Sequence, residues 1–312
     1  MEDNTSATPM SEQLVRDLLA ERRFDRRKTY FKYGVIALAA LTFLGGLRGA
    51  GSSTSSISEP YAAVVRVEGE ILPGRPASAE GLNPQLEKAF SDESAKAVIL
   101  LVNSPGGTPV QASLVHDRIK ALKAAHPGKP VVAVGEDMMT SGAYMIASAA
   151  DRIVVNRSTV AGSIGVITRG FGFSGLMNKL GVERRVQTAG ESKNMADPFM
   201  PQSEADRAKQ AHLLSKIHEH FIDTVKSGRG ERLKLNTPGL FSGAVWTGDE
   251  AVEAGLADSL GDLASVKKEL GVKTVHDLTP AEPLLQSLLG GVSTKVVTEL
   301  SAKSDVPLAL PR

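Results

Sequence analysis

The chain contains two short apolar runs, Ala97-Val-Ile-Leu-Leu-Val102 and Pro130-Val-Val-Ala-Val-Gly135, which are typical of strands buried on both faces of a parallel sheet. Between them, apolar side chains recur at helical spacing over residues 110–125, and this segment ends at a Pro-Gly pair. A strand, a helix and a second strand in this order predict a βαβ unit.

The same alternation continues on both sides of this unit. Further strands are expected over residues 62–67, 153–155, 163–167 and 182–188, and further helices over residues 140–150 and 204–227. Ser203 is a good N-cap for the longer helix, which carries a stripe of apolar side chains. We therefore predict one α/β domain with a mostly parallel sheet over residues 60–275, followed by a C-terminal tail over residues 276–312.

The N-terminal part of the chain reads as a membrane anchor. Residues 1–32 are polar and rich in Arg and Lys, and the fifteen residues from Tyr33 to Leu47 carry no charge. A spanning helix needs about 20 apolar residues, with roughly 17 as the lower end, so a span over residues 33–48 is just long enough if flanking basic side chains snorkel. The basic cluster predicts a cytoplasmic segment 1–32, and residues 49–59 read as a flexible linker. The alternative is a cleaved signal peptide, against which the long basic region and the missing Ala-x-Ala signature argue.

Composition excludes several classes of function. Lys+Arg is 36 and Asp+Glu is 35, so the chain has no overall basic charge that would attract nucleic acid. Cysteine is absent, and no His-Glu-x-x-His sequence occurs, so a zinc site is not expected. Residues 170–175 match a dinucleotide-binding pattern, but they lie in mid-chain and two Phe side chains would crowd a pyrophosphate.

Two turns are candidates for chemistry because each follows a predicted strand and precedes a predicted helix. Asn103-Ser-Pro-Gly-Gly107 can turn sharply and leave backbone N–H groups free to stabilise an oxyanion. Met139-Thr-Ser-Gly-Ala-Tyr144 can expose the hydroxyl of Ser141, as a nucleophile elbow does, although Gly-x-Ser-x-Gly itself is absent. Taken alone, the first can be a plain turn and the second an ordinary helix cap.

A serine nucleophile needs a base, and the sequence offers two kinds. Six histidines are present, but their spacing nominates none of them. Lys193 follows a Gly turn after the strand-like segment 182–188, and a lysine acts as a base where burial lowers its pKa. A solvated surface lysine is the ordinary alternative.

Three motifs together resemble the signal peptide peptidase A family of serine peptidases: Asn103-Ser-Pro-Gly-Gly107, Thr140-Ser-Gly-Ala-Tyr144 with the following residues to Val155, and Gly162-Ser-Ile-Gly165. The block from Phe241 to Gly261 is similar to that family's closing block. The resemblance implies a crotonase-like, caseinolytic-protease-like α/β fold, here a βαβ superhelix domain behind a single N-terminal transmembrane helix. It also implies a membrane-anchored endopeptidase that degrades hydrophobic peptides such as cleaved signal peptides, without metal or cofactor.

The resemblance also assigns roles to individual residues. Ser141 matches the nucleophile, Lys193 the general base, and Ser163 the hydroxyl that orients the lysine. The oxyanion donors implied are the amides of Gly106, Gly107 and Gly142, or that of Ser141. Ala143 stands where a second glycine is common and Met145 where a second aromatic is common, which puts the side-chain specificity in doubt.

Location and assembly follow as expectations. The catalytic domain is expected on the periplasmic side of a bacterial inner membrane, with no nucleic acid as partner. A homo-oligomer is expected, in which Ser141 and Lys193 need not come from one chain. Two other functions stay open: a catalytically silent membrane scaffold that binds hydrophobic peptides, and a crotonase-like acyl-CoA enzyme.

Overall fold

The computed structural model describes residues 33–34 and 59–280. The basic segment 1–32, nearly all of the expected span and linker, and the tail beyond residue 280 lie outside the described residues. Within the described part, no helix combines the length and the apolar character that a membrane crossing requires.

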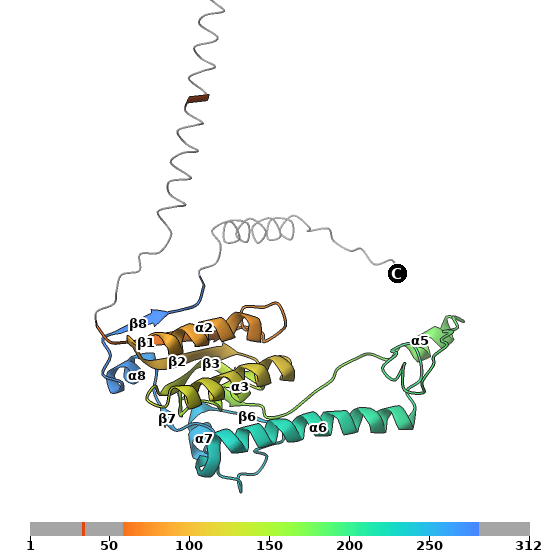
Figure 1. Ribbon diagram of the computed structural model, residues 1–312. Coiled ribbons are helices and arrows are strands. Elements are labelled where there is room, and N and C mark those ends of the chain that lie inside the picture. The colour runs from red at the N-terminus through yellow and green to blue at the C-terminus, as the bar shows by residue number, and fades with distance from the viewer. Residues whose placement is uncertain (1–32, 35–58, 281–312) are drawn as a thin grey trace, which may run out of the picture. The chain divides into compact units, whose positions relative to one another are not determined.

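The described residues form a mixed α/β fold around one sheet (Figure 1). Its path runs β6-β5-β3-β2-β1-β8, with β4 beside β3 and β7 beside β4. All pairs are parallel except β5 with β6. The strands are β1 (Tyr61–Glu68), β2 (Ala95–Ser104), β3 (Val131–Thr140), β4 (Arg152–Val155), β5 (Val160–Gly162), β6 (Val245–Trp246), β7 (Ser259–Leu260) and β8 (Thr274–Asp277). The mostly parallel α/β sheet predicted from the sequence is thus confirmed.

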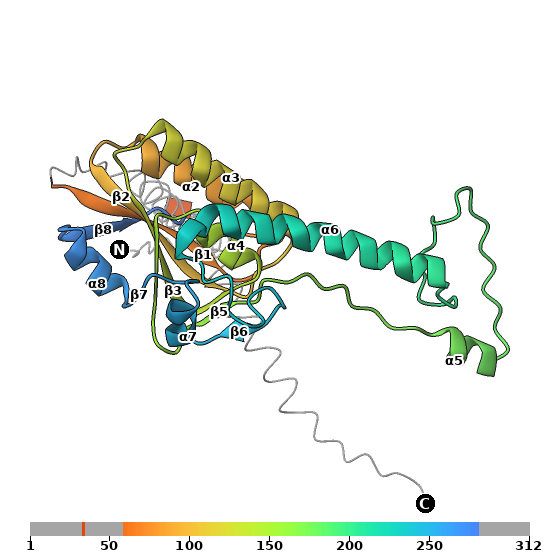
Figure 2. The same ribbon diagram turned by 90° about the horizontal axis from the view of Figure 1, so that it is seen from below.

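Helices cover both faces of this sheet (Figure 2). They are α2 (Ala79–Ser91), α3 (Pro109–Ala125), α4 (Gly142–Ala147), α5 (Ser174–Lys179), α6 (Glu204–Arg229), α7 (Gly248–Glu253) and α8 (Leu263–Glu269), with a 3-10 turn at Gly230–Arg232. Alternate residues of β1 to β4, such as Val64 and Ile99, form a core with Val266 of α8. The intervening residues are buried on the opposite face, which α2 and α4 contact.

Four helices were not predicted from the sequence: α2 and the shorter α5, α7 and α8. Ser78 is the N-cap of α2, and its hydroxyl accepts a hydrogen bond from the N–H of Gly81 (3.2 Å). It buries Leu82, Leu86 and Phe90, which recur every four residues and were therefore a readable helical signal.

Two segments predicted as strands are not strands. Over residues 163–167 the pairing has already ended at Gly162, because Gly162 and Ser163 both take a positive φ (90° and 51°) that interrupts an extended chain. Residues 182–188 have no strand beside them among the described residues, and Val182 is 49% exposed. The sequence indicated strands in both segments, but neither pairs with a strand among the described residues.

Residues 168–203, which we call the arm, leave the sheet after β5 and lead into α6. Both ribbon views place α5, which belongs to the arm, beside the first turns of α6 and away from the sheet (Figures 1 and 2). The side chain of Gln210 on α6 donates a hydrogen bond to the carbonyl of Met195 (3.3 Å), so the arm is tied to this end of α6.

The last strand extends the folded part slightly beyond the boundary at residue 275. In β8, His276 and Asp277 pair with Ala63 and Val64 of β1. The side chain of Asp277 also accepts a hydrogen bond from Arg66 (2.5 Å). The sheet therefore ends at Asp277.

Candidate active site

The parallel pairing of β2 and β3 brings the two candidate turns together. Ser104 of β2 lies in register with Met139 of β3, so the turn after each strand starts at the same edge of the sheet. Asn103–Gly107 and Met139–Tyr144 therefore lie side by side, although they are more than thirty residues apart in the chain.

Ser141 occupies the junction between β3 and α4 in a strained conformation. Its φ is 53° and its ψ is −124°, a region that residues with a side chain rarely adopt and that costs about 1–3 kcal/mol. The surroundings hold it there: its N–H donates to the carbonyl of Gly162 (2.8 Å), and its own carbonyl accepts from the N–H of Met145 (3.0 Å). Such strain is a property of nucleophile elbows, and here it marks Ser141.

The two glycines of the neighbouring turn are needed for close approach of the backbone. Gly106 has a φ of 96°, and a Cβ there would lie 2.7 Å from the Cβ of Ser141 and from the amide nitrogen of Gly142. A Cβ on Gly107 would lie 2.1 Å from the carbonyl oxygen of Ile71. No side chain fits at either position, so this turn packs directly on the Ser141 junction at Gly106 and on the backbone of Ile71 at Gly107.

Two backbone N–H groups beside Ser141 have no acceptor among the described residues, those of Gly107 and Gly142. The amide nitrogen of Gly107 lies 3.3 Å from the position that a Cβ of Gly142 would take, so the two groups are neighbours. The N–H of Gly106, the third expected donor, is engaged with the hydroxyl of Ser104 (3.1 Å), and that of Ser141 with Gly162. Free, adjacent N–H groups next to a serine hydroxyl can stabilise an oxyanion.

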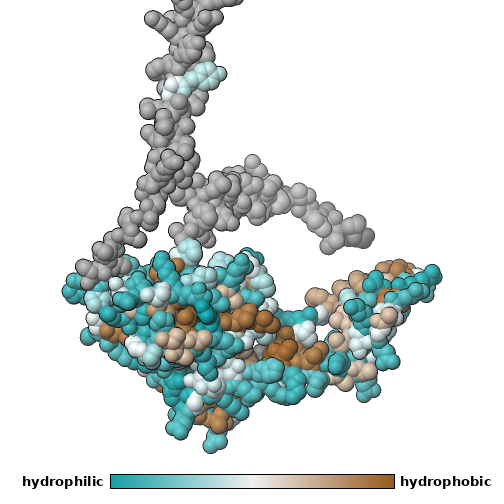
Figure 3. Space-filling model, in the orientation of Figure 1, coloured by the Kyte–Doolittle hydropathy of each residue, from teal (hydrophilic) through white to brown (hydrophobic). Residues whose placement is uncertain are grey.

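An apolar groove opens next to Ser141. It encloses about 100 Å³. Its lining includes Met145 of α4, Ile217 and Phe221 of α6, and the chain after β5 at Val166 and Ile167. Figure 3 shows hydrophobic residues on the surface between the sheet and α5. Ile167 of the groove lining is itself 63% exposed. The groove suits a hydrophobic group bound beside the serine, and Met145 is part of its wall.

The structure places Ser163 close to Ser141 in the hydrogen-bond network. Gly162, which accepts from the N–H of Ser141, is followed directly by Ser163 with a φ of 51°. The N–H of Ser163 donates to the carbonyl of Ala244 (2.8 Å). Ser163 therefore lies in the same short turn as Gly162, to which the N–H of Ser141 is hydrogen-bonded.

Lys193 lies elsewhere in the same chain. It is exposed in the arm, in a turn where its N–H donates to the carbonyl of Gly190 (3.2 Å). It is not among the residues that line the groove at Ser141. One chain, as far as it is described, thus brings Ser141, Ser163 and the free amides together, but not Lys193.

His218 was not singled out from the sequence, yet it contacts the site. Its Nε2 lies 3.0 Å from the carbonyl oxygen of Ile164, one residue after Ser163. Its position on α6, next to Ile217 of the groove wall, could be found only once the register of α6 over the site was known.

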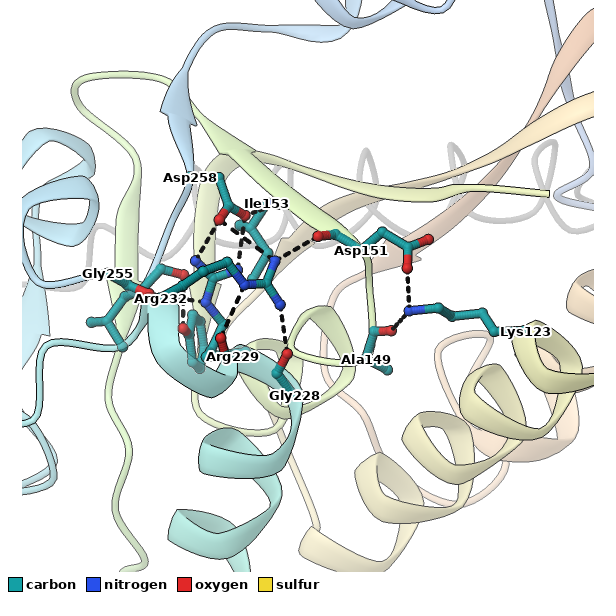
Figure 4. A network of polar contacts seen from close by, with 11 residues as sticks. Lys123, Ala149, Asp151, Ile153, Gly228, Arg229, Arg232, Gly255 and Asp258 are labelled. Carbon is teal, nitrogen blue, oxygen red and sulfur yellow. Dashed lines mark hydrogen bonds and ion pairs between the residues drawn. The ribbon is translucent and has the colours of Figure 1, made fainter. Parts of the chain in front are cut away.

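A buried ion pair anchors the other end of α6 (Figure 4). The guanidinium of Arg229, whose side chain is fully buried, donates to both carboxylate oxygens of Asp258 (2.8 and 2.9 Å) and to the carbonyl of Gly255 (2.9 Å). Burial by itself would raise the pKa of the Asp258 carboxyl. The hydrogen bonds from Arg229 and from the N–H of Ile153, with the charges of Arg229 and Arg232, outweigh burial and hold this pKa below its usual value. This network fixes the helix that carries Ile217 and Phe221.

Comparison with known proteins adds the family. The model of the family described as "Peptidase family S49" matches residues 123–275. The chain is 32% identical over 202 residues to a putative signal peptide peptidase SppA of Enterococcus faecium, covering 64% of this chain and 57% of that protein. It is also 46% identical over 239 residues to a protein of Brucella melitensis biotype 1 named Na(+)/H(+) antiporter NhaA, covering 73% of this chain and 32% of that protein.

A solved structure of the 1510-N membrane-bound stomatin-specific protease is similar at 15% identity and a TM-score of 0.45, covering 72% of this chain and all of that chain. The chain spans about a third of the antiporter and less than two thirds of the peptidase, so it corresponds to a part of each of these longer relatives. With the family model and the peptidase relatives in agreement, the chain belongs to peptidase family S49, the family of signal peptide peptidase A.

Proposed function

We propose that this protein is a membrane-anchored serine endopeptidase that degrades hydrophobic peptides, such as cleaved signal peptides. The observation that carries the proposal is the Ser141 junction: a strained serine, two free amides at Gly107 and Gly142, and an apolar groove beside them. As part of this proposal, the domain has a crotonase-like βαβ superhelix fold and follows a transmembrane helix at residues 33–48. The family to which the chain belongs supports the peptidase activity.

The proposed chemistry needs a base and no metal or cofactor. The neutral amine of Lys193 accepts the proton of the Ser141 hydroxyl while the oxygen attacks the scissile carbonyl. The amides of Gly107 and Gly142 hold the resulting oxyanion. The lysine then returns the proton to the leaving amine, and a water molecule, deprotonated by the same lysine, releases the acyl group from Ser141. Ser163 orients the lysine in this scheme.

We place the base in a neighbouring subunit. Lys193 is exposed on the arm of its own chain, and the arm carries apolar side chains that a partner would bury. Those that are at least half exposed in this part of the chain are Phe171, Leu176 and Leu180. A homo-oligomer in which the arm of one subunit reaches the groove of the next would bury both this surface and the lysine. Burial is what makes a lysine amine a base at neutral pH.

The membrane location rests on sequence outside the described residues. The basic cluster before residue 33 keeps the N-terminus in the cytoplasm, so the domain from residue 60 lies on the periplasmic side of a bacterial inner membrane. Hydrophobic peptides left in that membrane would then be near the groove.

Two other functions are retained as alternatives. A silent scaffold of the same fold would bind hydrophobic peptides in the groove without cleaving them. A crotonase-like acyl-CoA enzyme would use the same two amides on a thioester. The strained conformation of Ser141 disfavours both alternatives, because neither requires an activated hydroxyl at this position.

The test is covalent labelling of the full-length protein with a fluorophosphonate, which reacts with activated serines. Wild type should be labelled at Ser141, as mapped by mass spectrometry, and Ser141→Ala should not be labelled. Ser158→Ala, which removes an exposed serine outside the site, serves as the matched control and should be labelled like wild type. Equal labelling of Ser141→Ala would show that the nucleophile is another residue, and an unlabelled wild type would favour the scaffold.

A second prediction concerns the oxyanion donors. Gly107→Ala is expected to lower the rate of Ser141 labelling by about 10²-fold, the scale on which loss of one such donor acts. The added Cβ would lie 2.1 Å from the carbonyl oxygen of Ile71, so the turn must move and carry the free amide with it. At Gly128 an added Cβ meets nothing within 4 Å, so Gly128→Ala is the control. A rate in Gly107→Ala like that of wild type would exclude this amide.

A further inference from the structure

Trp246 of β6 is the only tryptophan in the chain, and it lies against the turn that follows β5. The indole nitrogen is buried and has no hydrogen-bond acceptor among the described residues. A Cβ placed on Gly162 would lie 2.6 Å from Cδ1 of the indole and 3.3 Å from its nitrogen. The ring therefore fills the space next to Gly162 in which any other residue would place its side chain.

The turn at Gly162 and Ser163 is strained and needs support from outside. Both residues have a positive φ, 90° and 51°, and Ser163 is not a glycine. A residue with a side chain keeps such a conformation only when its surroundings enforce it. β6 does this on one side: Ala161 pairs with Trp246, Gly162 pairs with Val245, and Ser163 donates to the carbonyl of Ala244.

The other side of the same turn holds the nucleophile. Thr140, the last residue of β3, pairs with Gly162, and the N–H of Ser141 donates to the carbonyl of Gly162 (2.8 Å). Gly162 is thus in contact with the indole of Trp246 on one side and hydrogen-bonded to Ser141 on the other. A shift of Gly162 would move the strained Ser141 and leave its N–H without its acceptor.

We infer that Trp246 is a positioning residue that holds the Gly162–Ser163 turn, and through it Ser141, in the geometry needed for attack. It does not line the groove at Ser141, so it acts through Gly162. The expected effect on catalysis rests on the proposed function. The expected support of the Ser141–Gly162 hydrogen bond is structural and does not depend on that function.

The structural part can be measured by hydrogen exchange of the full-length protein in detergent. In Trp246→Ala, the amides of peptides that contain Ser141 should exchange about tenfold faster or more, because the supported bond opens more easily. Trp246→Phe, which keeps an aromatic ring against Gly162, should restore most of the protection. The matched control is Val245→Ala, which truncates a side chain that is 56% exposed on the same strand.

Peptides from β1 and β2 report on the global stability and should exchange as in wild type. If Trp246→Ala does not fold, Trp246→Leu takes its place, because it keeps an apolar side chain on β6 without the flat ring. Unchanged exchange at Ser141 in a folded Trp246→Ala or Trp246→Leu protein would overturn the inference.

The catalytic part is measured by fluorophosphonate labelling of the same proteins. Trp246→Ala should label Ser141 about 10²-fold more slowly, the scale on which a misplacement of about 1 Å acts, and the loss should lie in the rate at saturation rather than in probe binding. Trp246→Phe should recover most of the rate. If Trp246→Ala exchanges faster at Ser141 but is labelled at the wild-type rate, the catalytic role is overturned. If wild type itself is not labelled, the proposed function fails, and hydrogen exchange still decides the structural role.

Discussion

Replacing Lys193 by alanine is expected to lower the rate of Ser141 acylation by about 10³-fold or more, the scale on which nucleophile and base act as a unit. The physical reason is that the serine hydroxyl attacks well only when its proton is removed, and no other base is provided in the proposed mechanism. The measurement is the rate of fluorophosphonate labelling of the full-length protein.

Two variants separate a base from a mere positive charge. Lys193→Arg should not restore the rate, because a guanidinium remains protonated. Lys179→Ala removes another exposed lysine of the arm and should leave the rate unchanged. Labelling of Lys193→Arg at the wild-type rate would remove Lys193 from the mechanism.

Mixed oligomers test where the base comes from. Ser141→Ala subunits keep Lys193, and Lys193→Ala subunits keep Ser141, so a dyad completed between chains should form in mixtures of the two. Activity should then be recovered, and native mass spectrometry should show that the oligomers are mixed. Mixed oligomers without activity would place both residues in one chain, which would require the arm to fold back over α6. A fully active monomer would contradict the assembly.

The largest expected effect on stability is that of Arg229→Met. It removes both guanidinium hydrogen bonds from the carboxylate of Asp258, which is only 16% exposed, and leaves the longer contact with Arg232 (3.6 Å) as its ion pair among the described residues. The loss should lower the free energy of unfolding by about 3 kcal/mol or more. Arg118→Ala breaks an ion pair with Glu87 of similar length (2.6 Å), but both side chains are at least 40% exposed. A change of about 1 kcal/mol or less is expected there. Denaturant unfolding of the three proteins checks the contrast, and equal midpoints would contradict it.

Acid should act on the same ion pair. The pKa of the Asp258 carboxyl is lowered in the folded protein, so its contribution is complete above the usual carboxyl pKa of about 4. The contribution is lost as the pH falls through the lowered pKa of the folded state. The difference in stability between wild type and Arg229→Met should therefore shrink below about pH 4. A difference that stays constant down to low pH would argue against an ionised Asp258.

Local sequence patterns were enough for much of the sheet and for part of the site. The buried strands β1 to β4 and the helices α3 and α6 were predicted because their apolar spacing is set by residues that are close in the chain. The turns that carry Ser141 and Gly107 were singled out as candidates for a similar reason, since each lies between a strand and a helix, whereas the roles proposed for the two residues came from the family resemblance. α2 could also have been found, because Leu82, Leu86 and Phe90 have helical spacing.

Only the tertiary structure could decide features that depend on a distant partner. Residues 182–188 have strand-like composition but no strand beside them in the described part of the chain, whereas β6 and β8 are strands because β5 and β1 offer edges to pair with. Which amides are free depends on contacts across the fold. The N–H of Gly106 donates to the hydroxyl of Ser104, whereas the N–H of Gly107 has no acceptor among the described residues.

The roles of Trp246 and Arg229 have the same origin, since each makes its decisive contact with a residue far away in the sequence. The sequence alone singled out the turn at Ser141 as a candidate, because its residues are neighbours in the chain. Only the tertiary structure shows which residues support that turn. It also shows that Lys193 lies on the arm of its own chain, away from the residues that line the groove at Ser141. The physical reason is that long-range packing and hydrogen bonds depend on which segments meet, and local periodicity carries no information about that.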